Sequence, residues 1–291
     1  MIRHYILTRF NLKLWKTDRN QCSTRSDQWL SKRFELFEKF CIPSIINQSF
    51  KDFTWIVLFD EGTPDSYKQR YRKYADVCPQ FSPIEVPSVV GVHFVRVFQN
   101  AVLQDLVAHN MNKTGCVVTT TYLDNDDALS FDFMEQVAQN THVVEQDTFI
   151  TMHYGLQYFE ELNIANHVKY KNNHFITLIE MYHENSRLKT VYGYGSHGNV
   201  YRHSQCAVIG INIKKQPSWV EVVHTTNAKN NVILHRWTSL ATERLILKAR
   251  FGIDIELRKD ARKIFYSMFL WRSVKAHMKY IKVKFFSLFH F

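Results

Sequence analysis

The 291-residue chain has few of the residues that interrupt regular structure, with nine glycines and six prolines. This scarcity excludes collagen-like, linker-rich and low-complexity chains. A hydrophobic fraction of 45% excludes wholesale disorder. The sequence has no window of about 18 uncharged apolar residues, so we expect no membrane-spanning helix.

Signals for secretion and for structural metal are also missing. The N-terminus MIRHYILTRF lacks the apolar core and the small-residue cleavage site of a signal peptide. The five cysteines are odd in number and widely scattered, which argues against a disulfide framework. His203 and Cys206 form the only tight His/Cys pair, and no second pair completes a four-ligand zinc site. We therefore expect a reduced, cytoplasmic compartment.

Positive charge is concentrated at the C-terminal end. The net charge is +10, and the last 31 residues carry seven cations and no acidic residue. Apolar residues recur there at steps of three or four beside a stripe of Lys and Arg. Such a helix, over residues 262–291, fits an anionic membrane surface, or else it packs its apolar stripe on the domain. The body has no basic groove or nucleic-acid motif, so no nucleic-acid partner is expected.

Strand-like and helix-like patterns alternate through the first 125 residues. Residues 2–9 have the pattern of a strand, and 53–59 and 115–123 have the pattern of strands buried on both faces. Segments with helical periodicity lie at 27–47, 64–75 and 96–110. This order predicts an α/β fold with a mostly parallel central sheet, right-handed crossovers and flanking helices.

The second half of the sequence is less regular. Further strands are expected at 147–153, 174–180, 188–194 and 206–213, and a helix at 238–251. We expect one catalytic domain over residues 1–235 and a C-terminal helical segment with the basic tail over residues 236–291.

The residues Asp124-Asn125-Asp126-Asp127 directly follow the strand predicted at 115–123. Three carboxylates in four residues repel each other unless a cation or a proton offsets the charge, and their hard oxygen atoms suit Mn²⁺ or Mg²⁺. One carboxylate can hold the metal while another accepts hydrogen bonds from a sugar hydroxyl. The ligand crevice of an open α/β sheet lies at this carboxyl edge.

Other interpretations of the acidic run are weaker. A solvated acidic turn is the simplest alternative. An EF-hand starting at Asp124 would need glycine where Leu129 stands. A phosphatase of the haloacid dehalogenase type usually carries its Asp-x-Asp motif near the N-terminus and continues with Thr or Val, whereas Ala128 follows here.

The segment LDNDDAL resembles the LDxDD signature of family 2 glycosyltransferases with the GT-A fold. A larger set of segments resembles the rhamnosyltransferase family of bacterial surface-polysaccharide clusters, over roughly residues 3–230: HYILTRFN, WLSKRFELFEKFCIPSIINQSFKDFTWIVLFDEGTP, TTTYLDNDDALSFDF, FITLIE and WVEVVHTTNAKN. The resemblance implies a nucleotide-sugar donor, a divalent metal, and a glycan or lipid-linked acceptor at the inner membrane. It also implies a basic residue before the Leu-Asp pair, where this chain has Tyr122.

The resemblance and the positions along the chain suggest roles for individual residues. Expected donor-binding residues are Thr8, Arg9, Asp60, Arg96 and Asp124. Expected metal ligands are Asp124, Asp126 and His224. Ordinary surface or structural roles are the alternatives for Arg9, Asp60, Arg96 and His224. Asp127 is expected to face the acceptor sugar or to cap a helix that begins near Ser130.

Glu180 ends an apolar strand-like run, where a buried carboxylate is costly without a function or a partner. We predict that it is the general base of an inverting transfer, with a structural salt bridge as the alternative. Two other functions stay open for the whole chain. One is metal-dependent phosphoryl transfer, and the other is non-catalytic sugar or membrane-surface binding.

Overall fold

The computed structural model describes residues 1–18, 21–184, 186–195, 205–213, 216–224 and 239–267. Within these ranges, none of the helices has the length and apolar character needed to cross a bilayer.

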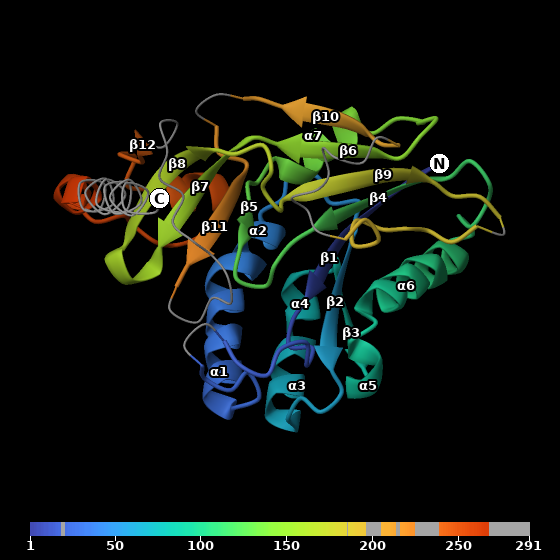
Figure 1. The fold of residues 1–291 in the computed structure, drawn as a ribbon, viewed down its shortest axis with the longest axis horizontal. Helices are drawn as coiled ribbons and strands as arrows, with labels where there is room; N and C mark the ends of the chain where they lie inside the picture. The colour runs from blue at the N-terminus through green and yellow to red at the C-terminus, as the bar shows by residue number, and fades with distance from the viewer. Residues whose placement is uncertain (19–20, 185, 196–204, 214–215, 225–238, 268–291) are drawn as a thin grey trace, which may run out of the picture.

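A seven-stranded central sheet has the strand order β10-β6-β9-β4-β1-β2-β3 (Figure 1). Its strands are β1 Ile2–Arg9, β2 Thr54–Asp60, β3 Phe81–Val86, β4 Val117–Tyr122, β6 Thr148–Met152, β9 Ile176–Met181 and β10 Ala207–Ile211. Strand β9 runs antiparallel to both β4 and β6, whereas the other neighbours pair in parallel. The expected α/β class with a mostly parallel central sheet is confirmed.

Helices cover both faces of this sheet. They are α1 Asp27–Leu36, η1 Phe37–Cys41, α2 Ile42–Ile46, α3 Asp65–Arg72, α4 Tyr74–Val77, α5 Ser88–Gly91, α6 Phe94–Ala108, α7 Phe133–Asn140, η2 Glu160–Leu162 and α8 Ile246–Phe251. On strand β2, Val57 and Phe59 belong to the core that contains α1 and η1. The alternate residues Ile56 and Leu58 belong to the core that contains α6. Because successive strand residues point to opposite faces and both faces are covered, every residue from Trp55 to Phe59 is apolar.

The helix predicted at 27–47 forms with one interruption. Its middle turn, η1, is π-helical and directly precedes the turn that contains Pro43. Proline has no backbone N–H, so the hydrogen-bond ladder must change register near it.

A second sheet of five strands has the order β12-β8-β7-β11-β5. Its strands are β5 Ala128–Leu129, β7 Tyr154–Phe159, β8 Ile164–Lys169, β11 Trp219–Val223 and β12 Ser239–Leu240. This second sheet was not predicted from the sequence. The strand predicted at 188–194 is wrong, because residues 190–194 form turns. Thr190 lies there in the left-handed backbone region, with φ +59, which a strand does not allow.

The described C-terminal residues pack on the second sheet. Strand β12 pairs with β8. Ile246, Leu247 and Phe251 of α8 share a core with Phe40 of η1 and Val222 of β11. The domain boundary at 235 remains a prediction. Most of the basic tail, residues 268–291, lies outside the described residues, although residues 261–267 are helical.

Candidate active site

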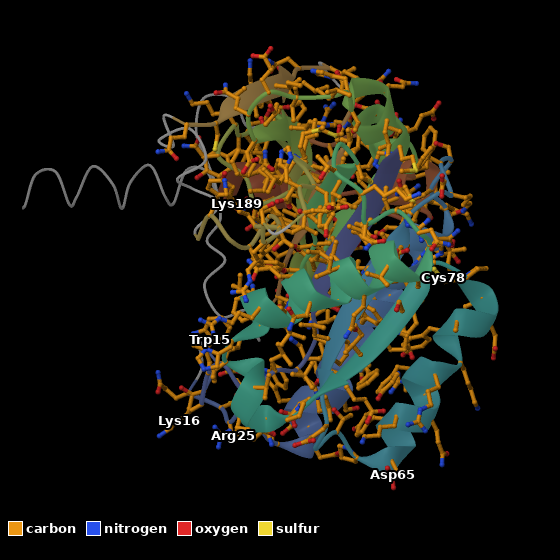
Figure 2. All side chains as sticks on the ribbon, turned by 90° about the vertical axis from the view of Figure 1, so that its right-hand side faces the viewer. Trp15, Lys16, Arg25, Asp65, Cys78 and Lys189 are labelled. Carbon is orange, nitrogen blue, oxygen red and sulfur yellow. The ribbon has the colours of Figure 1, made fainter. Side chains whose placement is uncertain are left out.

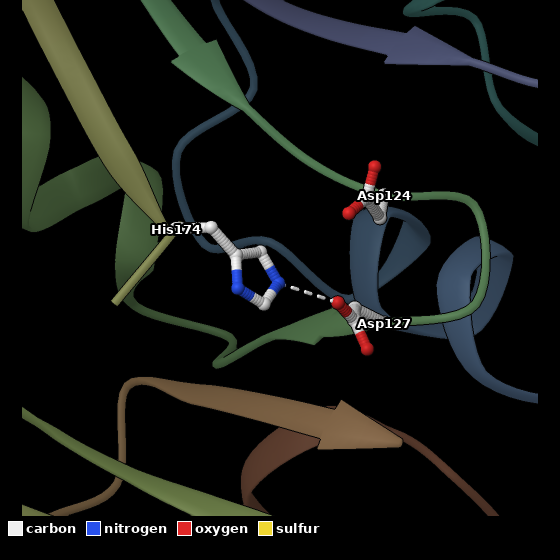
Figure 3. Close-up of side chains that lie close together, drawn as sticks. All are labelled: Asp124, Asp127 and His174. Atoms are coloured by element: carbon white, nitrogen blue, oxygen red, sulfur yellow. Dashed lines mark hydrogen bonds and ion pairs between the residues drawn. The ribbon is translucent and has the colours of Figure 1, made fainter. Parts of the chain in front are cut away.

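Three side chains converge where β4 ends. Asp124 and Asp127 open and close a turn, in which the Asp127 N–H donates to the Asp124 carbonyl at 3.4 Å. Together with His174, they offer ligand atoms that all lie within 4.8 Å of one another (Figure 3). The His174 Nε2 lies 2.7 Å from Asp127 Oδ2. Two carboxylates and one imidazole form a donor set that Mn²⁺ can accept.

His174 reaches this cluster because β9 runs antiparallel to β4. Thr177 of β9 pairs with Thr121 of β4, so the residues just before β9 lie beside those just after β4. The ring of His174 stacks on Phe175, with 4.2 Å between the ring centroids. His174 is not among the residues predicted from the sequence, because a lone histidine before a strand gives no signal unless the direction of that strand is known.

The carboxylates and the imidazole of the cluster shift each other's pKa values. Asp127 is 1% exposed and accepts a hydrogen bond from the Val222 N–H at 2.8 Å. Burial and the charges of Asp126 and Asp124 raise the pKa of Asp127, against the hydrogen bond from His174. Burial lowers the pKa of His174, but the hydrogen bond and charge of Asp127 outweigh it and raise that pKa. The pair therefore retains protons that a divalent cation could replace.

Asp126 points away from the cluster and forms a separate group. Its Oδ2 lies 2.8 Å from the Arg33 Nη1 and 2.8 Å from the His224 Nε2. Burial would raise the pKa of Asp126, but Arg33 and His224 hold it well below its ordinary range. The metal ligands predicted from the sequence, Asp124, Asp126 and His224, are thus divided between two groups.

Arg9 lies beside Asp124 at the end of β1. Its guanidinium carbon is 4.8 Å from the ring centroid of Phe94 and 5.0 Å from that of Tyr192. Its Nη2 donates to the Tyr122 hydroxyl at 2.7 Å and lies 3.6 Å from Asp124 Oδ1. The Tyr122 hydroxyl in turn donates to Asp124. A cation therefore lies next to the acidic motif, but it comes from β1 and not from position 122.

One hollow reaches Asp124 of the cluster, and a second hollow adjoins the first. The first, of about 100 Å³, is lined by residues that include Arg9, Trp15, Trp29, Arg33 and Asp124. Trp15 is 49% exposed and lies at the surface (Figure 2). The buried Nε atoms of Arg9 and Arg33 and the Nε1 of Trp29 have no hydrogen-bond acceptor in the described part of the chain. Three N–H groups around one hollow can thus serve a ligand rich in acceptor oxygens.

The second hollow, of about 250 Å³, shares Trp29 with the first and includes Asp60 in its lining. Asp60 ends β2 and accepts hydrogen bonds from the Gly62 N–H at 2.9 Å and the Ser88 hydroxyl at 2.8 Å. The Lys13 Nζ lies 3.3 Å from its Oδ1. Asp60 therefore caps the following turn and also borders a cavity, so both sequence-based interpretations agree with its position.

Two predicted donor residues lie elsewhere. Thr8 is fully buried, and its hydroxyl accepts a hydrogen bond from Trp55 Nε1 at 2.9 Å inside the core. Its side chain therefore does not face either hollow. Arg96 is exposed on α6, two residues beyond Phe94, and it does not line either hollow.

Glu180 lies near the end of β4 that is opposite to the cluster. It pairs with Val118, near the beginning of β4, because β9 is antiparallel. Its carboxylate accepts hydrogen bonds from the Lys189 N–H at 2.7 Å and the Thr190 N–H at 2.9 Å. The structure therefore does not bring Glu180 to the cluster, and the described contacts of its carboxylate anchor the backbone of residues 189 and 190. Burial raises its pKa to about 7, against these two hydrogen bonds.

One of the two alternatives predicted for Asp127, the capping of a helix that begins near Ser130, is wrong. Helix α7 begins at Phe133, and Asp132 occupies its N-cap position. Asp127 does not cap this helix.

The chain is similar to a known sequence family and aligns with solved structures. The sequence model of the family described as "Putative rhamnosyl transferase" matches residues 7–236. No curated protein matched the sequence. Among solved structures, S. aureus TarS aligns with 16% identity and a TM-score of 0.27, over 55% of this chain and 21% of TarS. The inositol-1-phosphate CTP transferase from T. maritima aligns with 11% identity and a TM-score of 0.37, over 78% of this chain and 90% of that protein.

Proposed function

The chain belongs to the rhamnosyl transferase family and is a glycosyltransferase with a GT-A-like α/β fold; we propose that it uses a nucleotide-sugar donor and Mn²⁺ or Mg²⁺. The sugar is rhamnose, as the family description suggests. The acceptor is a hydroxyl group of a glycan or a lipid-linked glycan in surface-polysaccharide synthesis, and the transfer inverts the anomeric centre.

The observation that carries this proposal is the position of the carboxylate-imidazole cluster beside a hollow lined by unpaired N–H groups. Asp124, Asp127 and His174 would hold the divalent ion. When bound, the ion would balance the negative charge that develops on the diphosphate leaving group. Arg9 and Arg33 would donate hydrogen bonds to the phosphate oxygens.

The second hollow would hold the nucleoside. It is lined by Asp60 and shares Trp29 with the first hollow. A carboxylate at its wall can accept hydrogen bonds from a base or a ribose, and an indole ring can stack on a base. The aromatic residues around Arg9 hold the guanidinium in place, so little side-chain entropy is lost when phosphate binds.

The membrane part of the proposal rests on the sequence of the basic tail. Residues 262–291 would bind the anionic inner leaflet of the membrane, near a lipid-linked acceptor. Deletion of residues 268–291, which spares the described helix at 261–267, should release the protein from anionic vesicles and leave transfer to a soluble acceptor intact. Unchanged vesicle binding would refute the tail's role alone.

A thermal-shift screen of UDP-sugars and dTDP-sugars, with and without Mn²⁺, tests the donor and metal assignment. The true donor at a hundredfold excess over its Kd should add about 2.7 kcal/mol of stability, and only when Mn²⁺ is present. The Asp124→Asn variant should lose this increment, while Asp52→Asn, an exposed aspartate, should keep it. A screen without any Mn²⁺-dependent shift would refute the proposal. Release of inorganic phosphate in place of nucleoside diphosphate would identify a phosphoryl-transfer enzyme.

A further inference from the structure

A row of buried polar side chains crosses the second sheet. Glu221 of β11 pairs with Gln157 of β7, and Gln157 pairs with Asn166 of β8. Residues directly opposite each other on paired strands point to the same face, so the three side chains form one line. Gln157 and Asn166 are fully buried, and Glu221 is 8% exposed. The Gln157 Nε2 donates to Glu221 Oε2 at 2.7 Å.

The Glu221 end of this row adjoins the metal cluster. The next residue, Val222, donates its N–H to Asp127. Trp219, two residues earlier on the same face, stacks on Phe175 with 4.8 Å between ring centroids, and Phe175 stacks on His174. Burial raises the pKa of Glu221, and the charge of His174 opposes this effect, as expected for close neighbours.

The far end of the row has an unsatisfied amide. Both the Nδ2 and the Oδ1 of Asn166 are buried, and neither has a hydrogen-bond partner in the described part of the chain. Leaving buried polar groups unpaired costs about 1–3 kcal/mol each, so native proteins rarely keep them without a function. A saccharide hydroxyl is both donor and acceptor, and it can satisfy both atoms of an amide.

We propose that this row is the acceptor subsite, with Glu221 as the general base and Asn166 as a ligand for a second acceptor hydroxyl. This inference rests on the proposed function, because it needs a sugar donor held at the neighbouring cluster. Neighbouring strands lie about 4.8 Å apart, so Glu221 and Asn166 are separated by roughly 10 Å, a span suited to a saccharide.

In the transfer step, the acceptor oxygen attacks the anomeric carbon of the donor and forms the new glycosidic bond. The bond from that carbon to the diphosphate oxygen breaks, and its electron pair leaves with the nucleoside diphosphate. The proton of the acceptor hydroxyl passes to the Glu221 carboxylate. Gln157 holds that carboxylate through its amide N–H. Glu221 thus takes the role that the sequence pattern suggested for Glu180.

Glu221→Gln tests the base. The variant keeps the shape of the side chain and removes the charge, so it should fold. Donor binding is measured by titration of UDP or dTDP with Mn²⁺. Transfer is measured as release of nucleoside diphosphate from the matching nucleotide sugar, with water and with p-nitrophenyl glycosides as acceptors. The matched control is Glu161→Gln, an exposed glutamate at the end of the same sheet.

We expect Glu221→Gln to lower the transfer rate at least about 100-fold, within the range of general-base catalysis, with donor affinity unchanged within twofold. The control should resemble the wild-type protein. A variant rate within threefold of wild type would overturn the assignment. Parallel loss of donor affinity and rate would also overturn it, because Glu221 would then belong to the donor site. If the wild-type protein itself binds no nucleotide, the proposed function fails first.

Asn166→Leu tests the far end of the row. If the amide binds the acceptor, this variant should raise the KM for the best p-nitrophenyl glycoside about tenfold while the donor KM stays constant. A purely structural amide would behave differently. Replacing an unpaired buried amide with leucine would then stabilise the fold and leave the acceptor KM unchanged, and that result would refute its role in binding.

Discussion

Replacing Glu180 with glutamine separates an anchoring role from a catalytic one. The carboxylate is almost fully buried, and burial raises its pKa from 4.5 to about 7. At 1.36 kcal/mol per pKa unit, this rise corresponds to about 3 kcal/mol. The folded protein therefore binds an extra proton between these two pH values. The contribution of Glu180 to stability is complete below pH 4.5 and is lost as the pH rises through about 7.

The assay is urea denaturation of the wild-type protein and Glu180→Gln at pH 4.5 and pH 7.5. Glutamine keeps only one acceptor oxygen for the two N–H groups of Lys189 and Thr190, which costs about 1–3 kcal/mol at every pH. The informative quantity is thus the change with pH in the stability difference. The wild-type protein should lose about 3 kcal/mol relative to the variant between the two pH values. Glu184→Gln, an exposed glutamate of the same segment, is the control.

Transfer activity gives the second measurement on Glu180→Gln. Glu180 lies beside the beginning of β4, whereas Asp124 follows the end of that strand. The transfer rate should therefore change less than tenfold. A fall of 100-fold or more with donor affinity intact would mean that Glu180 is the base after all. A stability difference that does not vary with pH would refute the argument from burial.

Two further substitutions test the cluster and its neighbour. His174→Ala removes one of the three ligand groups and should weaken Mn²⁺ binding at least about tenfold in calorimetric titration; unchanged affinity would exclude this histidine as a ligand. Arg33→Met removes the guanidinium from the buried Asp126 carboxylate and leaves its hydrogen bond with His224. This change should lower the free energy of unfolding by about 3 kcal/mol in chemical denaturation. The double variant Arg33→Met/Asp126→Asn should recover part of the lost stability, because it removes the unpaired charge. A double variant no more stable than Arg33→Met would refute the role of this ion pair in stability.

The sequence by itself determined the order of strands and helices in the first half and the position of the acidic motif. Apolar runs such as residues 53–59 are readable because a strand buried on both faces has no polar side. The motif at residues 124–127 is readable because carboxylates crowded after a strand need a cation. The resemblance to the rhamnosyltransferase family rests on segments spread over residues 3–230, and the family model matches residues 7–236.

Only the tertiary structure decided which side chains meet. Because β9 is antiparallel to β4, His174 lies beside Asp127 and Glu180 lies beside the beginning of β4. The direction of β9 depends on pairing between segments over 50 residues apart. Likewise, the register of β11 on β7 aligns Glu221 with Gln157. Short-range patterns encode burial and local conformation, whereas these contacts arise from long-range packing that no local pattern specifies.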